Sequence, residues 1–141
     1  QMRSYHAAQQ NIQRALDLDP NNIQYHLLMG EVLSASRDFQ NAVVELEIAY
    51  GSDALDNKDS ISLQLANSYC ELGNYEKAKG FYEKVLNKED IPNEKVVDER
   101  YRYAETLVKY KQFENAVKQW EIIKSTRNIY LDIDHKLKTY S

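Results

Sequence analysis

The side chains that most often carry chemistry are few in this chain and stand apart from one another. Its 141 residues include three histidines and one cysteine, Cys70. They form no zinc-ligand spacing such as HExxH or CxxC, and no histidine stands near Cys70 in sequence to activate it as a nucleophile. We therefore expect no metal, no cofactor and no catalytic residue. His6, His26 and His135 are expected on solvated helix faces, and Cys70 as an unreactive small side chain.

The patterns used for phosphate binding and acid–base catalysis are also missing. The four glycines stand singly, so no glycine-rich loop is available to cradle a phosphate. Gly30 and Gly73 are expected as a packing residue and a turn residue, and Gly51 as a helix stop. Pairs of acidic residues fall at helix ends or in loops, where both carboxylates stay solvated. They are Asp17 and Asp19, Glu89 and Asp90, and Asp132 and Asp134.

The composition is that of a globular chain without a surface for nucleic acid. Hydrophobic residues make up 43% and charged residues 28%, which disfavours disorder. The net charge is −4, so no basic surface for phosphate backbones or anionic lipids is expected. No run of about 18 apolar residues that could cross a membrane is present. With four glycines and two prolines, loops must be short, which disfavours a barrel or a sandwich.

A repeated pattern sets the expected architecture. Each repeat has an aromatic residue, an alanine three places later, and large apolar residues further on. The four matching stretches are 5–16, 39–50, 75–86 and 113–124. Their alanines are Ala8, Ala42, Ala78 and Ala116. Apolar residues spaced three, four and seven apart predict amphipathic helices.

A second helical pattern fills the intervals at 25–36, 61–72 and 99–110, with a small residue at Gly30, Ala66 and Ala104. Each unit is thus a helix, a tight turn and a second helix. Small residues are required where two antiparallel helices cross closely, because a larger side chain would push the backbones apart. Asp38 and Asn74 are placed to cap the helices that follow the turns.

This pattern resembles the tetratricopeptide repeat, a helix–turn–helix unit of about 34 residues. The stretches ALDLDPNN at 15–22 and LGNYEKA at 72–78 are similar to the end of that family's second helix and to its turn. The turn glycine is kept at Gly73 but replaced by Arg37 and Lys111. The family's tryptophan is replaced by Tyr25 or Ile61. The resemblance implies an all-α fold, a right-handed α-solenoid of stacked antiparallel helix pairs.

We expect a single domain over 1–141, taken from a longer protein. A half repeat at 1–20 is followed by full repeats at 21–54, 55–92 and 93–124. The segment 125–141 is either a capping helix or the first helix of a further repeat. It carries Ile129, Ile133, Leu137 and Tyr140 at helical spacing, with Asp132 and Asp134 facing away.

Eleven tyrosines raise the question of a recognition surface. Most of them, and Trp120, hold packing positions of the repeats and are expected in the core. Those tyrosines are Tyr5, Tyr69, Tyr75, Tyr82 and Tyr103. Tyr101 is the exception and is expected at the surface.

The resemblance also implies a concave groove lined by the first helix of each repeat. Transferred by register, the lining is Leu27, Glu31, Ser34, Leu63, Asn67, Cys70, Tyr101, Glu105 and Val108, with Arg102 beside it. One subclass of the family clamps a C-terminal carboxylate with basic and amide side chains. At the matching places stand Glu31 and Glu105, and only Asn67 conforms. We therefore expect a partner segment with basic and apolar side chains.

The expected function is a non-enzymatic scaffold that binds a helix or an extended segment of another protein, or that packs into a larger assembly. One alternative is an accessory domain of an enzyme whose catalytic part lies outside this chain, and another is a purely structural spacer. The abundance of Lys, Asn, Ile and Tyr is typical of a low-GC bacterium. A structural subunit of a bacterial envelope or flagellar-motor complex is therefore a further alternative. The sequence leaves the compartment open between cytoplasm and periplasm, and the oligomeric state open too.

Overall fold

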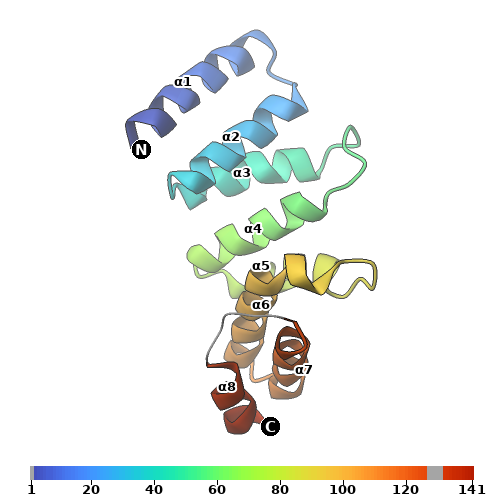
Figure 1. Cartoon of the computed structure of the whole chain (residues 1–141). Helices are drawn as coiled ribbons and strands as arrows, with labels where there is room; N and C mark the ends of the chain where they lie inside the picture. The colour runs from blue at the N-terminus through green and yellow to red at the C-terminus, as the bar shows by residue number, and fades with distance from the viewer. Residues whose placement is uncertain (1, 127–131) are drawn as a thin grey trace. The chain divides into compact units, whose positions relative to one another are not determined.

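The computed structural model describes residues 2–126 and 132–141, and within those ranges it contains eight α-helices, one 3-10 turn and no strand (Figure 1). By their contacts the residues divide into two compact units, 1–74 and 75–141. Unit 1 holds α1 (Met2–Leu18), α2 (Ile23–Ala35), α3 (Phe39–Tyr50) and α4 (Asp59–Glu71). Unit 2 holds α5 (Tyr75–Leu86), η1 (Asn93–Lys95), α6 (Val97–Lys109), α7 (Phe113–Lys124) and α8 (Ile133–Tyr140). The expected all-α repeat fold is confirmed, whereas Ile129 lies outside the described residues.

The helices follow the sequence pattern closely. Within each unit every helix packs against the next one along the chain (Figure 1). The second helices α3, α5 and α7 begin and end at the residues that the pattern predicts. The first helices α2, α4 and α6 each begin two residues earlier and end one residue earlier than predicted. The division into repeats and the role of α8 as a cap or a further first helix stay predictions.

The three turns within the helix pairs share one backbone geometry. Arg37, Gly73 and Lys111 adopt left-handed φ angles of 68°, 77° and 57°. In each turn the next amide donates to the carbonyl five residues earlier, at 2.8 Å or 2.9 Å. This bond defines the Schellman motif, for which glycine is the preferred residue. The motif therefore forms even where a larger residue replaces glycine, which explains why the turn survives two departures from the family pattern.

Capping at these turns is only partly as expected. The side chain of Asp38 accepts a hydrogen bond from the backbone amide of Asn41 at 3.4 Å, as predicted. Gln112 makes no side-chain cap for α7, and capping by Asn74 stays a prediction. The helix stop at Gly51 is confirmed, although this glycine has a right-handed φ of −74° and does not use its conformational freedom.

The small residues lie where helices cross. Ala42, Ala78 and Ala116 are fully buried, as are Ala66 and Ala104. Ala8, the equivalent residue of α1, is half-buried. Helices α2 and α3 approach each other closely, and a Cβ placed on Gly30 would lie 2.7 Å from Cγ of Leu46. The predicted packing role of these small residues therefore agrees with their burial.

Large aromatic side chains fill much of the core in unit 2. Trp120 and Tyr82 are fully buried, and the rings of Tyr82 and Tyr103 lie 5.9 Å apart. Tyr69 is likewise buried in unit 1, whereas Tyr5 and Tyr75 are half-buried at the surface ends of their helices. Burial raises the pKa of Tyr103 to about 12, with Glu83 adding to the shift.

A buried guanidinium ties the loop before α6 to the core of unit 2. Arg100 is 3% exposed and donates to the carbonyl of Leu86 at 3.3 Å, to Oε1 of Gln119 at 2.5 Å and to Oδ1 of Asn93 at 3.2 Å. Burial lowers the pKa of Arg100. The carbonyl of Leu86 ends α5, where the helix dipole favours a positive charge. Nothing in the repeat pattern singles out this residue.

Candidate partner-binding surface

In unit 1 the predicted groove residues lie on α2 and α4 and reach the surface. Glu31 is exposed, and the other five are half-buried. Those five are Leu27, Ser34, Leu63, Asn67 and Cys70. Oγ of Ser34 lies 3.4 Å from Oγ of Ser68, so α2 and α4 are adjacent at this point. The structure thus brings the two first helices of unit 1 together, as the repeat pattern predicts.

In unit 2 the remaining predicted residues lie on α6. Tyr101 and Val108 are half-buried, and Arg102 and Glu105 are exposed. The face that they form is partly covered, because the hydroxyl of Tyr101 donates to Oδ2 of Asp132 at 2.6 Å. Tyr101 is therefore at the surface as expected, but α8 occupies the space beside it.

The contacts around α8 correct the expected orientation of Asp132, whereas Asp134 stays exposed and pairs with a lysine. Asp132 does not face away from the fold, because it accepts the hydrogen bond from Tyr101. Asp134 forms an ion pair with Lys124 at 2.7 Å, and this contact lowers the pKa of Asp134. Periodicity alone could not show this, because it places apolar residues and leaves the polar partners undetermined.

Lys136 lies on the same face of α8 as Asp132 and adds to its contacts. Its Nζ lies 5.5 Å from the ring centre of Tyr101 and 5.4 Å from that of Trp120. A small hollow of about 170 Å³ remains beside it and is lined in part by Glu105, Val108 and Tyr140. The predicted groove face of unit 2 is thus a shallow, partly filled surface.

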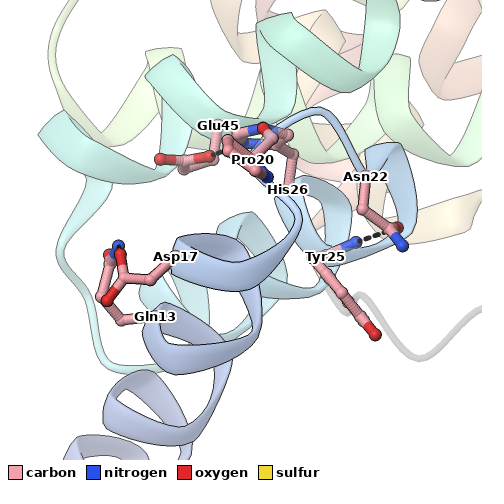
Figure 2. Close-up of polar contacts among 7 residues, drawn as sticks. All are labelled: Gln13, Asp17, Pro20, Asn22, Tyr25, His26 and Glu45. Carbon is pink, nitrogen blue, oxygen red and sulfur yellow. Dashed lines mark hydrogen bonds and ion pairs between the residues drawn. The ribbon is translucent and has the colours of Figure 1, made fainter.

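The structure also reveals a polar contact in unit 1 that sequence reasoning missed. His26 was expected on a solvated face, but its side chain is 15% exposed. Nδ1 lies 2.6 Å from Oε2 of Glu45, and Nε2 lies 2.7 Å from the carbonyl oxygen of Pro20 (Figure 2). A carboxylate and a carbonyl only accept hydrogen bonds, so both contacts are satisfied when the ring carries a hydrogen on each nitrogen, as an imidazolium does. Glu45 lies 19 residues from His26, and the three residues form no motif that could have revealed this contact.

The charge on His26 is sustained by those two contacts. Burial opposes the charged ring, but the hydrogen bonds to Glu45 and Pro20 outweigh it and raise the pKa of His26. The contact joins the loop after α1 to α3. His26 is therefore a structural cross-link in unit 1.

Neither a cluster of metal ligands nor a membrane-spanning helix is present among the residues that the structure describes. Among them no group of three or more histidine, cysteine, aspartate or glutamate side chains is arranged to hold a metal ion. Within the same part of the chain no helix has the length and apolar character needed to cross a membrane. Cys70 is half-buried on α4.

Comparison with known proteins supports the architecture. A family model described as "Tetratricopeptide repeat" matches residues 60–87, which cover nearly all of α4 and the whole of α5. The search of curated proteins finds no match. Among solved structures, YrrB, described as "a TPR protein with an unusual peptide-binding site", superposes with a TM-score of 0.81 at 14% identity, covering 98% of this chain and 68% of YrrB.

Two structures of MamA are similarly close. One has a TM-score of 0.80 at 13% identity and covers 97% of this chain and 72% of MamA. The other has a TM-score of 0.79 at 13% identity and covers 96% and 76%. At such identities the superpositions show the fold alone. Together with the repeat matched at 60–87, the buried alanines and the three equivalent turns, they show that this chain has the tetratricopeptide-repeat fold.

Proposed function

We propose that the chain is a non-enzymatic scaffold that holds a segment of a partner protein against the first helices of its repeats. The observation that carries this proposal is the division of each first helix into two faces. Ala66, for example, is fully buried, while Leu63 and Asn67 on the same helix are half-buried. A helix committed to the core on one side therefore leaves a mixed apolar and polar face for a partner.

The chemistry of that face favours a partner segment with apolar and basic side chains. Leu27 and Leu63 offer apolar contact area, and Glu31 adds an exposed carboxylate one turn after Leu27. Glu105 plays the same part on α6. An acidic tail would meet like charges here, so the face suits a basic helix or extended segment. The peptide-binding site described for YrrB supports a peptide ligand for this fold.

A second function, packing into a larger helical assembly, is favoured by one contact. The hydrogen bond from Tyr101 to Asp132 ties the residue before α8 to α6, while α8 itself packs against α7 within unit 2. A helix of another chain could dock on a first helix in the same way. In that case the exposed face would bind another chain of the assembly and would not bind a peptide segment.

Affinity purification with matched bait variants tests the first proposal. The groove variant carries Glu31→Lys, Asn67→Ala and Glu105→Lys. The control carries Asn87→Ala, Glu89→Lys and Glu121→Lys, which change the same residue types at exposed positions outside the predicted face. A partner lost only with the groove variant supports the proposal. A partner retained by both variants overturns it and moves binding to another face.

A further inference from the structure

Unit 1 carries a second recessed surface, on the side of α2 opposite to Glu31. One hollow of about 410 Å³ lies between α1 and α3 over part of α2, and another of about 370 Å³ adjoins it near Pro20. Both hollows are lined by Gln13 and Glu45, so they adjoin each other and are treated together as one depression. We call this depression the α1–α3 groove.

The α1–α3 groove has an apolar floor and amide-bearing walls. Met29 and Leu33 of α2 form the floor, and Val44 of α3, which is 54% exposed, adds an apolar edge. The amides come from both flanking helices: Gln9, Gln10 and Gln13 from α1, and Asn41 from α3. A primary amide both donates and accepts hydrogen bonds, as a peptide backbone does. Such a lining suits an extended chain that bonds the walls through its backbone and places alternate side chains on the floor.

The ionised lining of the α1–α3 groove is predominantly acidic. Asp17, Asp38 and Glu45 line it, and neither lysine nor arginine does so in the described residues. The imidazolium of His26 offsets one of these three charges by its contact with Glu45. The groove therefore keeps a net negative charge, which favours a basic occupant.

Asp17 is the carboxylate best placed to meet a cation. It lies in the last turn of α1, where the helix dipole adds negative potential. It accepts a hydrogen bond from Gln13 at 3.0 Å and has no cationic partner among the described residues. Figure 2 shows Gln13 and Asp17 projecting together from α1, with Glu45 and His26 meeting beside Pro20.

We propose that the α1–α3 groove binds an extended, basic segment of a partner protein, with a lysine or arginine side chain beside Asp17 and the backbone along the glutamine and asparagine amides. This site is separate from the face proposed above, because Met29 and Leu33 lie on the opposite side of α2 from Glu31. One molecule can therefore hold two partner segments on α2, one on each side.

Fluorescence anisotropy with a labelled nonapeptide of alternating arginine and valine tests the proposal. A peptide with glutamate in place of arginine is the reference probe. We expect the arginine peptide alone to bind, and Asp17→Lys to weaken that binding about tenfold or more. Asp17 is exposed, and lysine is favourable near a helix C-terminus, so this variant keeps its fold. Circular-dichroism melting verifies that it does.

The matched control is Glu89→Lys, which makes the same charge change at an exposed position outside both proposed surfaces. It should leave the affinity for the arginine peptide within about twofold, so that a loss confined to Asp17→Lys locates the site. Equal weakening by both variants, or equal binding of the glutamate peptide, overturns the proposal. Sedimentation that shows a dimer of the unmodified chain and a monomer of Asp17→Lys also overturns it, by assigning the groove to a second copy.

Discussion

The two units build the same repeat but fill their interiors differently. In unit 1, Gly30 lets α2 approach α3 until Leu46 fills the space that a Cβ would need. In unit 2 the matching residue is Ala104, and the interior is filled by Trp120 and by the buried guanidinium of Arg100. The small residues of the repeat therefore fix where helices cross. The residues between them decide how each core is filled.

Overpacking a repeated alanine should have the largest effect. Ala42→Leu inserts three carbon atoms at a crossing where the alanine is 0% exposed, and we expect it to lower the free energy of unfolding by about 3 kcal/mol. Ala8→Leu is the control, because Ala8 holds the same place in the pattern but is half-buried. Urea denaturation should show a clearly smaller loss for Ala8→Leu. Equal losses of stability would mean that the repeated alanine does not mark a buried helix crossing.

The buried guanidinium of unit 2 should be next in importance. Arg100→Lys keeps the charge but cannot reach all three acceptors, Leu86, Asn93 and Gln119, from one point. We expect a loss of about 2 kcal/mol in urea denaturation. Arg102→Lys, at an exposed position of the same helix, is the control and should change stability by less than about 0.5 kcal/mol. An unchanged Arg100→Lys variant would show that the guanidinium fork is dispensable.

Ala42 and Arg100 show which features of the core could be predicted from the sequence and which could not. Ala42 was predictable, because helix crossings at a fixed period impose a small residue each time, and the period is visible in the chain. Arg100 was not, because its partners come from a loop, a helix end and a neighbouring helix that no spacing rule connects. His26 escaped notice for the same reason.

The candidate surface likewise combines residues that the sequence predicted with contacts that it did not predict. The register predicted which residues of the first helices reach the surface, and Glu31 and Leu63 lie there. It did not predict that Asp132 would accept a hydrogen bond from the hydroxyl of Tyr101, because that contact depends on where α8 packs in the fold. The α1–α3 groove was likewise invisible, since a hollow depends on side-chain packing between helices and leaves no periodic signal.

Two glycines sharpen the comparison between the units. A Cβ on Gly30 would overlap Leu46, whereas a Cβ on Gly80 in α5 meets nothing within 4 Å. Alanine improves helix propensity by about 1 kcal/mol at both places. We expect Gly80→Ala to stabilise the chain by nearly that amount and Gly30→Ala to destabilise it by about 1 kcal/mol, after the overlap is included. Thermal unfolding of both variants would refute this account of close packing if they shifted in the same direction.

The cross-link at His26 should make the stability of unit 1 depend on pH. Its pKa is raised above the ordinary value of 6.5, so its contribution is complete below that value. The contribution is lost as the pH rises through the raised pKa of the folded protein. Removing it with His26→Gln should therefore cost more near about pH 5.5 than near about pH 9, by less than about 1 kcal/mol. His6→Gln is the control, and a difference independent of pH would contradict the imidazolium.

The smallest effect is expected at the turns, where the left-handed position holds lysine at 111 in unit 2 and glycine at 73 in unit 1. Lys111 holds a left-handed φ of 57°, whereas Gly73 adopts 77°. A side chain in this region costs about 1–2 kcal/mol, and glycine instead loses about 0.5–1 kcal/mol of chain entropy on folding. Lys111→Gly should therefore stabilise the protein by about 0.5 kcal/mol, and the reverse change Gly73→Lys should destabilise it by a similar amount. Precise melting curves for both variants provide the measurement. Opposite shifts of similar size would show that the two turns share one geometry and that only their conformational strain differs. A loss of stability in Lys111→Gly would instead mean that the lysine side chain makes contacts that offset its strained backbone.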